Sequence, residues 1–193
     1  MSLMLMRYGT DLNDILHSIR INAPSGSLLG SIAAEIVEMA SCYAMDGRHF
    51  IEAGDPVNAV ASFSYAAGWL DCGYCLGIII CPAPGPDFFS AGTDAVPDSA
   101  VPRLIEKTAR YERLLGKAIQ ALASAPEAGT RPLEYAKRVL LVAEVYLSHG
   151  RALGGGSRLV PALASFSYGH AWLDAGLRAG LFRVVSDRDL FTV

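Results

Sequence analysis

The chain has 193 residues, of which 52% are hydrophobic and 18% are charged, and its net charge is −3. Nucleic-acid binding usually needs a basic surface, so this composition argues against a nucleic-acid partner. The length permits one or two domains, and much of the apolar content is alanine and glycine, which favours closely packed helices.

The first half of the chain predicts three helices. Residues 3–21 carry apolar side chains at helical spacing and form the first. Ser27 then offers an N-cap for a second helix over 28–53. Asp55 offers a second N-cap, and the proline after it suits the first position of a third helix over 56–80.

A segment rich in proline, glycine and aspartate, residues 81–101, follows the third helix. This composition removes helical hydrogen bonds and predicts a linker, and Phe88 and Phe89 indicate that it packs on the surface. We therefore divide the chain into a first helical repeat over 1–80, the linker over 81–101 and a second helical repeat over 102–193.

The second half repeats the plan of the first. Helices are expected over 102–124, 131–153 and 159–182, and the tail 183–193 is expected to be extended or frayed. Strand signals are weak throughout. The predicted fold class is therefore all-α, with two repeats of three helices each.

The two halves are copies of one another. Residues 59–77 align without a gap with 162–180, at an offset of 103 residues, and 11 of the 19 positions are identical. A long period seen only twice indicates a duplicated domain rather than a solenoid. The same register aligns Tyr43 with Tyr146 and Arg48 with Arg151, so it extends beyond the third helices.

One arc of the third helix is kept in both copies and mixes large with small side chains. In the first copy its members are Ala59, Ser62, Phe63, Tyr65, Trp69, Leu70, Gly73 and Gly77. Such a mixture lets a neighbouring helix approach closely while the aromatic rings fill the gaps. It predicts that Trp69 and its counterpart Trp172 are core anchors.

Asp71 and its counterpart Asp174 lie on the opposite arc, among apolar residues. A carboxylate in such surroundings costs free energy unless it is paired or hydrogen-bonded. Arg48 and Arg151, kept in both copies, are the predicted partners, and an ion pair would fix the register of adjacent helices. A role in lining a ligand pocket and a role as catalytic acid or base remain the alternatives.

The spacing of the cysteine and histidine residues matches no metal-binding motif. The four cysteines, at positions 42, 72, 75 and 81, all lie in the first half, and they are expected to be small buried hydrophobes rather than zinc ligands. We expect no metal, no cofactor and no assignable catalytic residue. Residues 59–81 carry one charge but several polar side chains, so no membrane span is expected.

The sequence YAAGWLDCG at 65–73, preceded by DGRHF at 46–50 and by Gly54-Asp55, resembles the DUF357 family of short proteins. The resemblance implies an α-helical fold in an archaeal, cytoplasmic setting, and it brings no activity with it. The second copy departs from the pattern, with His149 in place of the aspartate that begins DGRHF.

The resemblance also suggests an arrangement for the two repeats. If single-unit relatives pair as homodimers, this chain is the fused equivalent, a pseudo-twofold six-helix bundle. The face with Tyr65, Trp69 and Gly73 would then meet its counterpart. The chain would be a monomer with an internal pseudo-dimer, or a homodimer.

Three functions are compatible with these patterns. The leading one is a non-enzymatic helical interaction or scaffold protein that binds another protein. The second is a small-molecule binding module with pockets between helices, and the third is an enzyme using Asp71 or Asp174 as acid or base. The candidate ligand-binding residues are Arg48, Tyr65, Trp69, Asp71, Arg151, Tyr168, Trp172 and Asp174.

Overall fold

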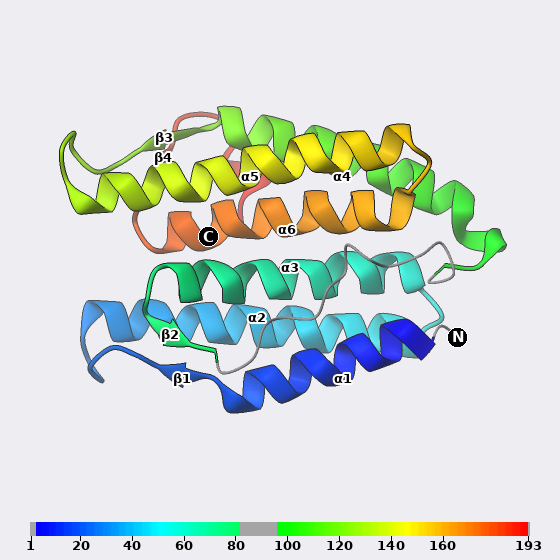
Figure 1. Ribbon diagram of the computed structural model, residues 1–193, viewed down its shortest axis with the longest axis horizontal. Helices are drawn as coiled ribbons and strands as arrows, with labels where there is room; N and C mark the ends of the chain where they lie inside the picture. Colours follow the sequence, from blue (N-terminus) through cyan, green and yellow to red (C-terminus); the bar gives the residue numbers. More distant parts are fainter. Residues whose placement is uncertain (1–2, 82–95, 193) are drawn as a thin grey trace.

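Six helices in two halves make up the computed structural model, which describes residues 3–81 and 96–192 (Figure 1). The first half contains α1 (Leu3–Ser18), α2 (Leu28–Glu52) and α3 (Pro56–Cys75). The second half contains α4 (Val101–Gln120), α5 (Arg131–Gly155) and α6 (Leu159–Arg178). The predicted all-α class with two three-helix repeats is confirmed. Most of the predicted linker, with Phe88 and Phe89, lies outside the described residues.

Four helices end earlier in the structure than the sequence predicts. They are the helices predicted over 3–21, 56–80, 102–124 and 159–182. In the structure these ends pair as short antiparallel ribbons. β1 (Arg20–Ile21) pairs with β2 (Ile79–Ile80), and β3 (Leu122–Ser124) pairs with β4 (Phe182–Val184). Two 3₁₀ turns, η2 (Asp98–Ala100) and η3 (Arg188–Leu190), complete the elements, so the tail is only partly extended.

The end of each third helix has a local cause. Gly77 and Gly180 follow α3 and α6 with φ angles of 72° and 75°. Glycine adopts this left-handed conformation without the steric cost that other residues incur, so it commonly terminates a helix. The chain then turns back, and the next residues reach the end of the first helix of the same half.

The predicted N-caps of the first half are present. The Ser27 hydroxyl accepts a hydrogen bond from the Gly30 amide at 3.0 Å. The Asp55 carboxylate accepts a hydrogen bond from the backbone N–H of Asn58 at 3.1 Å. Each cap satisfies a backbone donor that the first turn of a helix leaves open.

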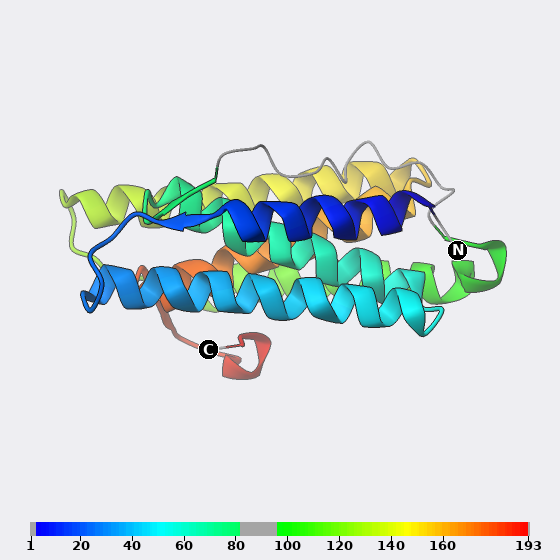
Figure 2. The same cartoon turned by 90° about the horizontal axis from the view of Figure 1, so that it is seen from below.

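Helices α3 and α6 lie side by side at the centre of the molecule and run in the same direction (Figure 1). α2 packs against α3, and α5 packs against α6, so each half covers one side of the central pair (Figures 1 and 2). One hydrophobic cluster draws its buried residues from both halves, including Trp69 and Trp172. The two repeats therefore share a core, and both tryptophans are core anchors as predicted.

The contact between the central helices uses only part of the face that was expected, since Tyr65 reaches the other half but Gly73 does not. A side chain at Gly68 would place its Cβ 2.6 Å from the Tyr168 carbonyl oxygen and 2.7 Å from the Ala171 Cβ, so α3 and α6 come closest there. Gly73 faces Ile36 of α2 instead, and Gly176 faces Val139 of α5. The conserved arc thus includes residues that pack inside each repeat as well as residues that reach the other one.

Candidate functional site

Each central aspartate accepts a hydrogen bond from a tyrosine of the other half. The Tyr65 hydroxyl on α3 donates to Asp174 Oδ2 on α6. The Tyr168 hydroxyl on α6 donates to Asp71 Oδ2 on α3, at 2.7 Å. The same two repeat positions are thus used twice, in opposite directions, across the interface between the halves. This reciprocal set, Tyr65–Asp174 and Tyr168–Asp71, is the candidate site.

The predicted Arg–Asp ion pairs are wrong. Arg48 donates to Asn13 Oδ1 of α1 at 2.9 Å, and Arg151 pairs with Glu112 of α4 at 2.8 Å. Both arginines therefore join the first and second helices of their own repeat. A helical wheel places the aspartates opposite the conserved arc, and this side of each third helix faces the other repeat rather than its own second helix.

Asp174 is fully buried and is held from two elements. Thr192, near the end of the chain, donates to Asp174 Oδ2 at 2.8 Å, beside the tyrosine. The other carboxylate oxygen of Asp174, Oδ1, has no hydrogen-bond partner among the described residues. The same terminal segment is fixed to α6 by His170, whose Nε2 lies 2.8 Å from the Leu190 carbonyl oxygen.

Burial is the largest influence on the pKa of both central carboxyl groups. It raises the pKa of Asp174, opposed by nearby His170 and by the hydrogen bonds from Tyr65 and Thr192. It also raises the pKa of Asp71, opposed by the hydrogen bond from Tyr168. The pKa of Tyr65 is raised by its own burial and then by Asp174, so this hydroxyl keeps its proton and remains a donor.

A pH dependence follows from these shifts. An aspartate whose pKa is raised on folding binds its proton more tightly in the folded state, so its stabilising contribution is present at low pH and is lost as pH rises through the raised pKa. Asp174→Asn, which resembles the neutral acid, is therefore expected to gain stability relative to the natural protein as pH rises from 4 toward 8. Urea unfolding of both proteins across this range measures the difference. A difference that is constant with pH would contradict the assignment.

Removing one hydroxyl tests the cross-repeat pair directly. Tyr65→Phe is expected to lower the free energy of unfolding by about 1–2 kcal/mol, because Asp174 loses a buried donor while the ring remains in place. The matched control is Tyr74→Phe on the same helix, whose side chain is 58% exposed and whose change is expected to stay within about 0.5 kcal/mol. Equal effects in urea unfolding would refute a stabilising role for the pair.

The eight candidate residues do not converge on one cavity. Tyr65 lines a small cavity of about 190 Å³ with Tyr43, Tyr111, His170 and Thr192. Arg48 lines a separate groove of about 370 Å³, and Arg151 a third of about 420 Å³. Trp69 is fully buried in the shared core, and its indole N–H has no acceptor among the described residues.

The cysteines differ in how far they are buried. Cys72 is buried, and its thiol lies 3.8 Å from the Trp172 carbonyl oxygen, which fits a small residue in the helix interface. Cys42 is exposed, so the prediction that the cysteines are buried is wrong there. In residues 3–81 and 96–192 no group of three or more His, Cys, Asp or Glu side chains is arranged to hold a metal ion.

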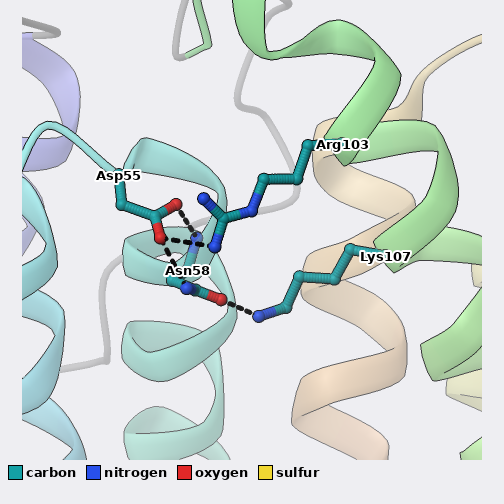
Figure 3. A network of polar contacts seen from close by, with 4 residues as sticks. All are labelled: Asp55, Asn58, Arg103 and Lys107. Carbon is teal, nitrogen blue, oxygen red and sulfur yellow. Dashed lines mark hydrogen bonds and ion pairs between the residues drawn. The ribbon is translucent and has the colours of Figure 1, made fainter.

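A second polar network between the halves was not predicted from the sequence. Arg103 of α4 pairs with Asp55 at 2.7 Å, and Lys107 of α4 donates to Asn58 of α3 (Figure 3). Burial, and then the charge of Arg110, lowers the pKa of Lys107 to about 8. At the offset of 103 residues Lys107 aligns with Met4. The first repeat therefore has no equivalent lysine, and comparing the two copies could not predict this network.

Comparison with known proteins agrees with this duplicated architecture. The family model described as "Protein of unknown function (DUF357)" matches the chain twice, over residues 7–79 and 110–182. No curated protein and no solved structure matches the chain. The two matches together cover well over half of the sequence, one in each half. The chain therefore belongs to the DUF357 family, as a tandem duplication of its helical unit.

Proposed function

We propose that this protein is a non-enzymatic interaction protein that binds another protein along the exposed face of α2. The proposal rests on one observation. Among the described helices, α2 is long and apolar enough to cross a membrane by length and composition alone, a property that core helices and signal sequences share. Yet only 28% of its most apolar 18-residue stretch is buried.

The exposed residues of α2 include apolar and small side chains and three acidic ones, Glu38, Asp46 and Glu52. Leu28 and Leu29 in its first turn are 76% and 53% exposed, and Met45 near its other end is also exposed. The exposed positions between them include small or weakly polar residues, namely Ser31, Ala34, Ser41 and Cys42. Figure 1 shows α2 on the side of α3 away from α6. Exposed apolar side chains at both ends of a helix, with small residues between them, suit an interface with another protein.

A partner protein fits this face better than a lipid surface. Glu38 and Asp46 are exposed on the same helix. Membrane-surface helices usually carry lysine and arginine on their polar side, because the lipid headgroups that attract them are anionic. Acidic side chains next to apolar ones suit a protein partner with basic groups at the rim of its contact area.

The central polar groups support an interaction protein over an enzyme. Asp71 and Asp174 each accept a hydrogen bond from a tyrosine of the other half, so both carboxyl groups serve the interface between repeats. A general acid or base must instead lie within hydrogen-bond reach of a substrate.

Site-specific photocrosslinking tests this proposal. A photoreactive amino acid at Ser41, on the exposed face of α2, is expected to give one discrete adduct with another protein in cells that make the full chain. The matched control is Glu144, the equivalent exposed position on α5. Met45→Glu is expected to reduce the Ser41 adduct about tenfold, since a charge would enter an apolar interface.

Three results would overturn the proposal. Equal adducts from Ser41 and Glu144 would show that contact is not specific to α2, because α5 also exposes the apolar side chains of Leu141 and Val145 beside Glu144. An adduct between two copies of this chain would identify a homodimer interface. Adducts with lipid would identify a membrane surface. Circular dichroism of Met45→Glu serves as the fold control.

A further inference from the structure

Two equivalent grooves lie on the surface, one in each repeat. The first lies between α1 and α2, has a volume of about 370 Å³ and is lined by Arg48, Asn13, Met6 and Ile51 among others. The second, of about 420 Å³, has Arg151 at the equivalent position. Because the arginine is kept at the repeat offset and lines a groove in both copies, each groove is a repeated feature of the structure.

The two guanidinium groups have different partners. In the second groove Arg151 forms an ion pair with Glu112, with 2.8 Å between Nε and Oε1. The position of Glu112 is occupied in the first repeat by Gly9. A side chain there would place its Cβ 2.9 Å from the Phe63 ring, so a carboxylate cannot enter from this position without moving the ring.

Arg48 therefore bonds a neutral group instead. It donates through Nη1 to the Asn13 amide oxygen at 2.9 Å. Glu52 also lines the groove, but it forms no ion pair with Arg48. The positive charge of the first groove thus has no carboxylate partner among the described residues, whereas that of the second groove has one.

We propose that the first groove binds a carboxylate-bearing ligand, with the Arg48 guanidinium as its receptor. The Arg151–Glu112 pair in the second groove shows the contact that the ligand makes. A guanidinium binds a carboxylate through strong, charge-assisted hydrogen bonds. Met6 and Ile51 in the same groove offer apolar contact for a short alkyl chain attached to the carboxylate. This groove adjoins the α2 face proposed above, since Arg48 follows Met45 by one helical turn, but the two proposals rest on different residues and different ligands.

Two single-residue changes test the proposal in opposite directions. Asn13→Asp keeps the size of the side chain and supplies an internal carboxylate to Arg48, so binding at the first groove is expected to fall at least about tenfold. Glu112→Gln removes the internal carboxylate of the second groove, so a second binding site is expected to appear. Both changes lie at partly exposed contacts, and thermal unfolding checks that the fold is retained.

The probe is glutarate, a dicarboxylate with a short alkyl chain, titrated into the full chain and followed by NMR of the arginine side-chain N–H groups. Selective shifts of the Arg48 signal that saturate, and that Asn13→Asp removes, support the proposal. Equal binding by the natural protein and both variants, or no binding at millimolar glutarate, would overturn it. So would equal displacement by inorganic phosphate, because the site would then recognise any anion.

A second probe separates the two sources of a carboxylate. N-acetyl-glutamate amide carries the side chain of an acidic peptide, whereas glutarate represents a free metabolite acid. Tighter binding of the capped amino acid supports a groove that receives an acidic segment of a protein, and tighter binding of glutarate supports a small-molecule site. Glutarate binding is measured with the purified chain and no protein partner, so failure of one proposal leaves the other open to its own test.

Discussion

Replacing Trp69 with alanine is expected to lower the free energy of unfolding by about 3–5 kcal/mol. Trp69 is the largest fully buried side chain in the described part of the chain, and it belongs to the cluster that both halves share. Its indole N–H has no acceptor there, so the loss comes from removed apolar contacts and from the cavity left behind. Urea unfolding at constant pH measures the change.

The control for this substitution is Tyr74→Ala on the same helix. Tyr74 is also aromatic but is 58% exposed, so its truncation is expected to cost no more than about 0.5 kcal/mol. A loss below about 1 kcal/mol for Trp69→Ala would mean that the ring does not support the shared core. Loss of one half before the other, seen as two unfolding steps, would mean that the repeats do not unfold together.

Replacing Gly68 with alanine is expected to cost up to about 3 kcal/mol, even though alanine favours a helix more than glycine does. The added Cβ would lie 2.6 Å from the backbone oxygen of Tyr168 and 2.7 Å from the Cβ of Ala171. Backbone atoms cannot turn aside as a flexible side chain can, so α3 and α6 would have to separate. The hydrogen bonds between the tyrosines and aspartates across the interface would lengthen as a result.

Gly116→Ala provides the matched comparison for Gly68→Ala. Gly116 is also in a helix interior, but an added Cβ there would come no closer than 4.0 Å to the Leu147 side chain. Alanine is expected to stabilise the protein at this position by about 0.5–1 kcal/mol, because it restricts the unfolded chain and favours the helix. Stabilisation by both substitutions, measured as thermal unfolding, would contradict the close approach of α3 to α6.

Features that depend on neighbours in the chain could be predicted well. Ser27 and Asp55 cap the helices that they precede, because a cap bonds an amide only three residues away. The duplicated three-helix plan also followed from aligned residues. The helix ends were less predictable, since the residues after Gly77 and Gly180 pair with strands from a distant part of the same half.

The partners of the central aspartates could not be read from one copy of the repeat. The sequence identified Asp71 and Asp174 as carboxylates among apolar residues that need a partner, and it identified Tyr65 and Tyr168 as conserved. A helical wheel shows which residues share a face, but the neighbour of that face depends on how the two repeats pack. The nearest conserved cations, Arg48 and Arg151, were therefore assigned wrongly.

The sequence by itself determined the six helices, their N-caps in the first half, the duplication and the family, because each depends on local propensity or on residue identity. Only the tertiary structure decided that Tyr65 and Tyr168 reach across to Asp174 and Asp71. It also decided that Lys107 bonds Asn58 between the halves. These contacts join residues 49 to 109 positions apart, and their geometry is set by the packing of α3, α4 and α6 rather than by any periodicity within one helix.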